Sequence, residues 1–428
     1  MSLPSSWPAL RSADPIRTYY AYSAAWAFFG ALTSTLSMVY YVRQAGLDPL
    51  QMVLVGTTLE LACFLFEIPT GIVADLYSRR LSIIIGFVLI GAGYLLQGLV
   101  PAFLAILAAQ VLWGIGFTFT SGADQAWITD EIGTDRVGPV MVRSQQVGLA
   151  GTIAGIVTAG ALGLISLPLP LVLSGAGMIL IALLLAAFMR EANFHRTPAA
   201  ERETFREMAD TFKHGLSVAR RRPVVRTLVL ISLISGLSSE AFDRLWSVKI
   251  LDFTFPTVFG TSDPAFWFAV LALVGTLLSL VSSLGLNKLS PDRVSATHPN
   301  GVLALLSLLE VVGVISFALL DHLWLALAAM WLRTIAGTLA WPIESAWLNR
   351  HVDSRSRATV ISMVSQSNAI GQVVGGPPLG ALAGRSGLRA ALLTSGLILT
   401  PIPALYLRLR EVRRPEETDA QHSPTTRP

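Results

Sequence analysis

The sequence is poor in charged residues and in cysteine. Only 14% of its 428 residues are Asp, Glu, Lys or Arg, whereas 53% are hydrophobic, and ordinary soluble domains carry about 25% charged residues. A chain this apolar lacks the polar side chains that would cover a water-facing surface. The single cysteine, Cys63, excludes an intramolecular disulfide and a cluster of metal-binding thiolates. The composition therefore predicts a protein whose exterior mostly faces lipid.

The motifs of soluble enzymes are also missing. All six histidines fall in expected loops, in the tail or near the ends of apolar segments, so no metal cage or catalytic triad is apparent: His195, His214, His298, His322, His351 and His422. No glycine-rich loop is followed by the lysine that phosphate binding needs. Lysine occurs only at positions 213, 249 and 288, and the net charge of +4 comes mostly from arginines in loops. We expect no enzyme activity, no cofactor, no metal and no nucleic-acid partner.

Long apolar segments dominate what is present. About 20 apolar residues in a helix cross a bilayer core, and twelve candidate spans meet that rule: 18–42, 49–70, 81–99, 102–128, 141–165, 168–189, 224–248, 265–286, 299–320, 323–348, 358–383 and 388–408. The N-terminus, MSLPSSWPALRSADP, is polar and interrupted by prolines, so we expect no cleaved signal peptide. The predicted fold class is an all-α membrane protein with twelve transmembrane helices in two six-helix bundles.

Positive charge gives the orientation. Arg79, Arg80, Arg136 and Arg143 lie in alternate loops on one side of the predicted spans, and positively charged loops stay in the cytoplasm. We expect a multi-pass protein of a bacterial inner (cytoplasmic) membrane with both termini cytoplasmic. The predicted segments are a cytoplasmic N-terminus (1–17), a first bundle (18–189), a cytoplasmic linker (190–222), a second bundle (223–408) and a disordered cytoplasmic tail (409–428). Apolar residues at helical spacing in the linker predict an amphipathic helix on the membrane face.

The two predicted bundles repeat each other. A shift of 220 residues places the sequence from Asp124 to Trp127 over that from Glu344 to Trp347. The same shift aligns the glycines of the fifth and eleventh spans: Gly151, Gly155 and Gly160 with Gly371, Gly375 and Gly380. A repeat of this kind indicates two halves of the same topology in parallel orientation.

The loop after the second span reads GIVADLYSRR, residues 71–80. Its pattern G-x-x-x-D-x-x-x-R-R resembles the signature loop of the major facilitator superfamily, whose usual form is G-x-x-x-D-R-x-G-R-R; Leu76 and Ser78 depart from it. With the repeat and the number of spans, the resemblance covers nearly the whole chain. It implies transport by alternating access, with Asp75 contacting the N-terminal end of the eleventh span. The cytoplasmic gate would comprise Glu67, Gly71, Asp75, Arg79, Arg80 and Arg143.

Ionisable residues inside the predicted spans are costly, about 2.5–3.5 kcal/mol each at a helix centre. Four carboxylates are candidates for proton coupling: Glu60, Asp124, Glu310 and Glu344. A carboxyl group shielded from water can bind and release a proton near neutral pH. A structural alternative stays open, in which Glu310 and Arg333 only neutralise each other and Asp124 and Glu344 bond to loops or pair with Arg143 or Arg350. A further cluster, Glu240, Asp243 and Arg244, lies in the outer part of the seventh span.

The resemblance assigns the walls of the substrate cavity to the first, fourth, seventh and tenth spans. On those spans the candidates are Tyr22, Trp26, Phe29, Gln110, Trp113, Phe117, Ser239, Trp331, Arg333 and Trp341. A mostly aromatic cavity with few polar groups suits amphiphilic or flat apolar molecules better than sugars. The alternative is that these aromatic side chains face lipid or mark the membrane interfaces.

These observations favour proton-coupled efflux of hydrophobic or amphiphilic small molecules by a drug/proton antiporter-like transporter, expected to be a monomer in the lipid bilayer. Antiporters of that type usually carry Arg where Gln110 stands here. Their fifth span carries G-x-x-x-G-P-x-x-G-G, whereas here the fifth span has the glycines without the proline. One alternative is uptake or facilitated passage of a small organic metabolite. Another is a membrane sensor on the same fold that transports nothing.

Overall fold

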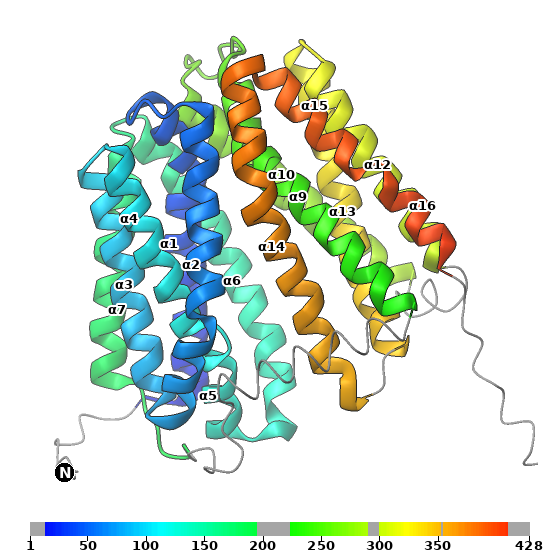
Figure 1. Ribbon diagram of the computed structural model, residues 1–428. Helices are drawn as coiled ribbons and strands as arrows, with labels where there is room; N and C mark the ends of the chain where they lie inside the picture. The colour runs from blue at the N-terminus through cyan, green and yellow to red at the C-terminus, as the bar shows by residue number, and fades with distance from the viewer. Residues whose placement is uncertain (1–12, 195–222, 290–298, 352–353, 410–428) are drawn as a thin grey trace, which may run out of the picture.

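The computed structural model describes residues 13–194, 223–289, 299–351 and 354–409. In these ranges the chain is almost entirely α-helical, and the only β-type pairing is an isolated bridge between Val258 and Thr261. Figure 1 shows the helices as two groups that stand side by side. The predicted all-α fold class is confirmed. The predicted amphipathic linker helix and C-terminal tail lie outside the described residues.

The first group contains seven helices: α1 (Pro15–Arg43), α2 (Pro49–Leu76), α3 (Arg79–Leu99), α4 (Phe103–Thr120), α5 (Ala123–Ile132), α6 (Thr134–Gly163) and α7 (Pro168–Phe188). The second group also contains seven described helices: α9 (Pro223–Leu251), α10 (Pro264–Leu289), α12 (Pro299–Leu319), α13 (Leu323–His351), α14 (Ser354–Ser386), α15 (Leu388–Leu399) and α16 (Pro401–Arg408). Several of them begin with proline. Proline is favourable in the first helical turn because a backbone N–H at that position would have no partner within the helix.

Two of the predicted spans are interrupted helices. The fourth span divides into α4 and α5 at Ser121 and Gly122, where Gly122 takes a positive φ of 76° that a residue with a side chain rarely adopts. The last span divides into α15 and α16 at Thr400, immediately before Pro401. Proline has no N–H to continue the helical hydrogen bonds, so the break falls there. Hydropathy alone gave both spans as continuous.

Among the described residues, eleven helical segments are long and apolar enough to cross a membrane, counting α4 with α5 and α15 with α16 as one segment each. The remaining long helix is α14, with 33 residues. It occupies the place of the predicted eleventh span and packs between α9 and α2. Helix α14 is more polar than the others because its sequence carries Ser362, Ser365, Gln366, Asn368 and Gln372.

The two groups are built on the same plan. Helix α1 packs on α6 as α9 packs on α14, and α3 packs on α4 and α7 as α12 packs on α13 and α15. Equivalent glycines allow close contacts of this kind: a Cβ on Gly155 would press on the carbonyl oxygen of Phe28, and one on Gly375 would press on that of Leu237. The aligned glycines of the sequence repeat therefore occupy equivalent positions in the fold.

The two groups touch through α2 with α14 and α6 with α10. Here too the repeat holds, because Gly160 of α6 approaches Ala269 of α10 and Gly380 of α14 approaches Val53 of α2. Arg43, the last residue of α1, donates to the carbonyl oxygen of Leu251, the last residue of α9, at 3.0 Å. All these contacts lie toward the end of the molecule that carries the α1–α2 connection. The opposite ends of the two groups lie apart (Figure 1).

The glycine contacts predict a position-dependent effect of a single methyl group. Gly155→Ala and Gly375→Ala should each destabilise the protein by about 1–3 kcal/mol, because the Cβ would press on a backbone oxygen of the neighbouring helix. Gly138→Ala in α6 and Gly384→Ala in α14 are matched controls, since nothing lies within 4 Å of either added Cβ. The midpoint of thermal unfolding of the purified protein in detergent measures the difference. Equal midpoints for the four variants would contradict the packing account.

Candidate functional site

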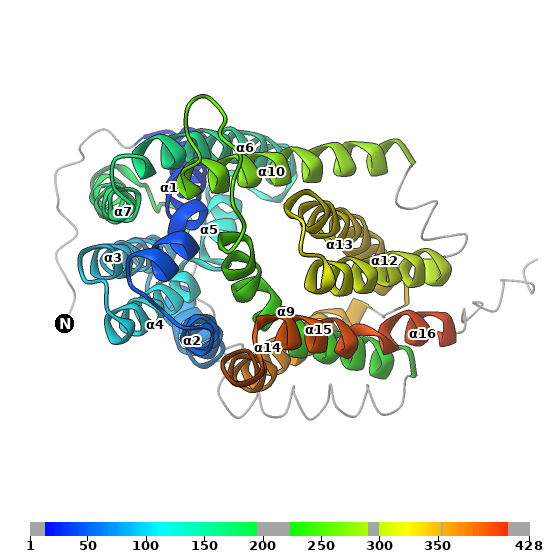
Figure 2. The same ribbon diagram turned by 90° about the horizontal axis from the view of Figure 1, so that it is seen from above.

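A cavity of about 380 Å³ lies between the two groups of helices. Five helices line it: α1 with Ala31, Ser34 and Thr35, α6 with Thr152 and Ile156, α9 with Phe242, Asp243 and Trp246, α10 with Phe268, Leu271, Ala272 and Thr276, and α13 with Met330, Arg333 and Thr334. Figure 2 shows α1 and α6 on one side of this space and α9, α10 and α13 around the other. The cavity thus draws its walls from both halves.

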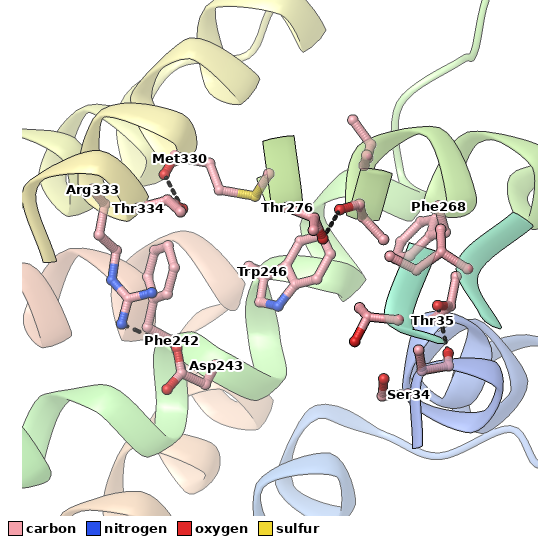
Figure 3. Close-up of a pocket in the computed structure, with 15 residues that line it drawn as sticks. Ser34, Thr35, Phe242, Asp243, Trp246, Phe268, Thr276, Met330, Arg333 and Thr334 are labelled. Carbon is pink, nitrogen blue, oxygen red and sulfur yellow. Dashed lines mark hydrogen bonds and ion pairs between the residues drawn. The ribbon is translucent and has the colours of Figure 1, made fainter. Parts of the chain in front are cut away.

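The cavity wall carries a carboxylate and a guanidinium in direct contact. Arg333 Nη2 lies 3.0 Å from Asp243 Oδ1, and the Asp243 side chain is 50% exposed whereas that of Arg333 is 23% exposed. A second carboxylate, Glu310 of α12, has Oε1 at 3.8 Å from Arg333 Nε. Figure 3 shows the Arg333 side chain reaching from α13 toward Asp243 on α9. One arginine therefore faces two carboxylates from two other helices.

Packing places this arginine between an aromatic ring and α12. Its guanidinium carbon lies 4.3 Å from the centre of the Phe242 ring, in cation–π contact. On the other side, Gly313 of α12 lets α13 approach closely, because a Cβ there would lie 3.1 Å from the backbone nitrogen of Arg333. Gly313 lies three positions after Glu310 on the same helix, so α12 and α13 approach each other closely next to the Glu310 carboxylate.

Three threonines add hydrogen-bond acceptors to the cavity. Three threonine hydroxyls that line it donate their protons to carbonyl oxygens of their own helices: Thr35 to Ala31 at 2.6 Å, Thr276 to Ala272 at 2.8 Å and Thr334 to Met330 at 3.0 Å. Each of these hydroxyl oxygens keeps lone pairs that can accept a hydrogen bond. Trp246 and Phe268 stack with ring centres 5.5 Å apart and give the cavity an aromatic wall.

A second ion pair lies beside the cavity, inside the contact between the two halves. Arg244 Nε lies 3.0 Å from Glu240 Oε1, and the Glu240 side chain is only 3% exposed. Both belong to α9, yet they press on α2, since a Cβ on Gly56 would overlap Glu240 Oε1 and Arg244 Nε. Gly376 of α14 also lies against Glu240. The absence of a side chain at Gly56 makes room for this pair.

Glu60 of α2 completes the group, since it lies within electrostatic range of Glu240, Arg244 and Asp243. We call these six residues the central charge cluster: Glu60, Glu240, Asp243, Arg244, Glu310 and Arg333. The cluster contains four carboxylates and two guanidinium groups. With every group ionised it carries two surplus negative charges, which are costly at membrane depth unless protons or a bound cation neutralise them.

The predicted cavity residues lie in several places. Arg333 lines the cavity, whereas the ring of Trp26 packs on Phe87 and that of Phe29 on Gly177. Trp113 donates to the hydroxyl of Tyr94 at 2.9 Å and stacks on Phe117. Ser239 bonds to the carbonyl oxygen of Gly236, Trp331 packs against the core of the second half, and Trp341 is 73% exposed. Their contact with a substrate stays a prediction.

Gln110, which stands where the resemblance to drug/proton antiporters leads us to expect Arg, belongs to a buried network. Its amide nitrogen lies 3.2 Å from the hydroxyl of Tyr41 and 3.2 Å from Gln97 Oε1. Tyr41 in turn donates to Gln97 at 2.6 Å. Three neutral side chains thus satisfy one another within the first half. Tyr41 also lies within electrostatic range of Arg244, which connects this network to the central charge cluster.

The other two proton-coupling candidates lie away from the cavity. Asp124 accepts a hydrogen bond from Tyr22 at 3.2 Å and one from the backbone nitrogen of Gln125 at 2.7 Å. Glu344, its equivalent in the second half, interacts with the hydroxyl of Tyr406 on α16. The repeat therefore gives each half a buried tyrosine that contacts an acidic side chain, although the tyrosines come from non-equivalent helices.

The predicted gate residues lie toward the end of the molecule where the two groups of helices stand apart (Figure 1), which we call the open end. Arg79 pairs with Asp130 of α5, and the backbone nitrogen of Arg80 donates to Glu191 at 2.9 Å, so both arginines bond within the first half. Asp75 and Glu67 are exposed, and Arg143 bonds to Gln146 on its own helix. The side chains at the N-terminal end of α14, where Asp75 is expected to dock, lie outside the described residues. The gate stays a prediction.

Sequence reasoning grouped Glu240, Asp243 and Arg244 but did not assign the group to the cavity. The spacing of Asp243 and Trp246 could have indicated the cavity, because residues three positions apart share a face of a helix and both of these line it. In the described ranges, no three His, Cys, Asp or Glu side chains stand close enough together to hold a metal ion.

The family description "Major Facilitator Superfamily" matches residues 18–375, with a second match over 298–427. A relative in Bacillus subtilis (strain 168), the uncharacterized MFS-type transporter YxaM, is 22% identical over 400 residues, which are 92% of this chain and 96% of that protein. The fold is similar to that of the nucleoside transporter NupG, with a TM-score of 0.73 at 14% identity over 92% of this chain and 98% of that one.

It is also similar to a bacterial homologue of the human lysosomal transporter Spinster in an inward-facing, unoccupied conformation, with a TM-score of 0.67 at 18% identity over 92% and 95% of the two chains. The chain belongs to the Major Facilitator Superfamily, as the signature loop and the repeat predicted. It is therefore a multi-pass membrane transporter of a small molecule, and a transporter fold rather than an enzyme fold carries the cavity.

The buried pair of α9 should be more sensitive to removal of one partner than of both. Arg244→Gln should destabilise the protein by about 3–5 kcal/mol, because it leaves the buried charge of Glu240 unpaired. Glu240→Gln together with Arg244→Gln should recover most of that loss. Arg389→Gln is the control, since its pair with Asp321 is 59% and 73% exposed and should contribute little. Thermal unfolding in detergent measures all three, and a double variant as unstable as Arg244→Gln would contradict this account.

Proposed function

We propose that the protein exports small amphiphilic cations in exchange for protons, by alternating access between its two helix bundles. The observation that carries the proposal is the half-exposed carboxylate of Asp243 in a cavity walled by aromatic rings and hydroxyl acceptors. A cation with an apolar body would bind its charge to the carboxylate and its body to the rings of Trp246 and Phe268. Its N–H groups would donate to the threonine oxygens.

The surplus of carboxylates supports coupling to protons. With every group ionised, the central charge cluster has two more negative than positive charges. Unpaired charges of this kind are unfavourable at membrane depth. Either a proton or a cationic substrate can neutralise a surplus carboxylate, and once one of them has bound, that carboxylate has no charge left to attract the other. Competition between the two ligands for the cluster leads to exchange. Of the four carboxylates predicted as proton carriers, the geometry favours Glu310, because it faces the arginine that lines the cavity.

The proposed transport cycle uses the contacts between the halves. Positive charge in the loops supports a cytoplasmic position for the open end, and this structure would then correspond to the state that loads substrate from inside the cell. Twelve spans, with α14 as the eleventh, would place both termini in the cytoplasm, and the molecule would act as a monomer in the cytoplasmic membrane. Separation of α2 from α14 and of α6 from α10 would open the opposite side.

Proteoliposomes with an internal pH-sensitive dye test the proposal. We expect tetraphenylphosphonium, a lipophilic cation, to move in the direction opposite to protons, and triphenylphosphine oxide, a neutral molecule of similar shape, to move no protons. Asp243→Asn should weaken binding of the cation at least about tenfold, equivalent to about 1.4 kcal/mol, and abolish the proton signal. Asp321→Asn is the control, because Asp321 lies on the surface away from the cavity and is 73% exposed.

Each other outcome would contradict part of the proposal. Protons that move with the cation would indicate uptake by symport, and cation transport without proton movement would indicate a facilitator. An Asp243→Asn variant with wild-type binding would remove Asp243 from the site. If neither compound binds or is transported, the proposal of an exporter for amphiphilic cations is wrong and the sensor hypothesis gains support.

A further inference from the structure

Arg333 is shared unequally between its two carboxylates. Its contact with Asp243 is 3.0 Å long, which is a direct ion pair, whereas its Nε lies 3.8 Å from Glu310, beyond hydrogen-bond distance. That Nε is buried and has no hydrogen-bond partner. An arginine with one bond made and one donor unused can satisfy the second carboxylate by a short movement of its side chain. The structure therefore captures one of two possible pairings.

The surroundings suit such a movement. The guanidinium lies over the face of the Phe242 ring, and a small shift of the guanidinium within about 6 Å of the ring centre keeps this cation–π contact. Both Arg333 and Asp243 line the cavity, so the guanidinium is not enclosed by protein on that side. On the other side, Gly313 keeps α12 close to α13 and holds Glu310 within reach.

We propose that Arg333 is a shared counter-ion that links proton binding at Glu310 to cation binding at Asp243. The inference rests on the proposed function, because it takes Asp243 as the group that binds the substrate. When Glu310 is ionised, Arg333 can pair with it and leave the carboxylate of Asp243 free for a cation. When Glu310 is protonated, Arg333 pairs only with Asp243 and neutralises it. The substrate and the proton then exclude each other although they occupy different residues.

The remaining charged groups near the two carboxylates do not supply the same link. Glu310 is faced by Arg333 and Glu344 from α13, by Asp243 from α9 and by the hydroxyl of Tyr406 from α16. On α15, which also packs on α12, Arg389 lies at the far end and pairs with Asp321. Asp243 is faced by Glu60 from α2, and by Glu240 and Arg244, which pair with each other. Among these described groups, Arg333 is the cation that contacts both carboxylates.

The link has a definite sign. A proton on Glu310 leaves Arg333 paired with Asp243, so the affinity for a cation should fall as the pH is lowered. By reciprocity, binding of a cation should lower the affinity of Glu310 for its proton by the same factor. Couplings between sites typically change affinity by about 5–150-fold. Direct competition, in which Asp243 itself takes the proton, gives the same sign. The two mechanisms differ in what a substitution at Glu310 does.

Equilibrium dialysis of radiolabelled tetraphenylphosphonium against the purified full chain in detergent, from pH 6 to pH 8, distinguishes them. Wild-type binding should weaken about tenfold toward pH 6. Glu310→Gln mimics the protonated state, so it should bind about tenfold more weakly than wild type at pH 8 and should lose most of the pH dependence. Adding Arg333→Gln to Glu310→Gln frees Asp243 again and should restore the affinity at pH 8. A purely structural role of Arg333 would not produce this rescue.

The results separate this inference from the proposed function. Loss of binding in Asp243→Asn, together with full pH dependence in Glu310→Gln or no rescue by Arg333→Gln, would overturn the shared counter-ion and leave the cation site intact. Wild-type binding in Asp243→Asn would overturn the proposed site itself. Each variant is compared only after its thermal unfolding midpoint matches that of the wild type, and Glu310→Asp, which keeps the charge, should retain the pH dependence.

Discussion

Close approach of helix backbones at glycine is the constraint on which the rest of the structure depends. Inside a bilayer, helices gain little by hiding apolar side chains from one another, so packing has to come from surfaces that fit closely. Here Gly155 brings α6 onto α1 and Gly375 brings α14 onto α9. The same device serves the electrostatics, since Gly56 makes room for the Glu240–Arg244 pair and Gly313 brings Arg333 toward Glu310. In this protein, close helix packing and the placement of charged side chains therefore both depend on glycine.

The two arginines of the central charge cluster work in different surroundings. Arg244 is paired with a carboxylate of its own helix, four residues away, and the pair is enclosed between α2, α9 and α14. Arg333 pairs with carboxylates of two other helices and faces a cavity. A pair within one helix keeps its geometry when helices move, whereas a pair between helices depends on their relative position. The pairing of Arg333 thus depends on how α9, α12 and α13 pack within the second half.

Much of the fold could be predicted from the sequence, because the spans and the repeat are patterns in the order of residues. Gly160 and Gly380 were aligned by a shift along the chain, and in the structure both lie where the two halves meet. The cavity could not be read in the same way. Trp113 and Trp341 are on helices that the family uses for cavity walls, but one bonds to Tyr94 and the other is exposed. Hydropathy gives a helix and not its rotation, which is decided by packing against its neighbours.

The position of the Glu240–Arg244 pair connects the electrostatics to the movement of the halves. It lies where α9 of the second half meets α2 of the first half, a contact that would separate if the closed end opened. In the closed contact the pair is shielded, and each partner satisfies the other. Separation would admit water to both charges, and solvation would compensate for the lost helix contacts. Apolar packing of the same volume is often as stabilising as a buried ion pair or more so, and we infer that this pair favours the closed contact less than an apolar contact of that size would.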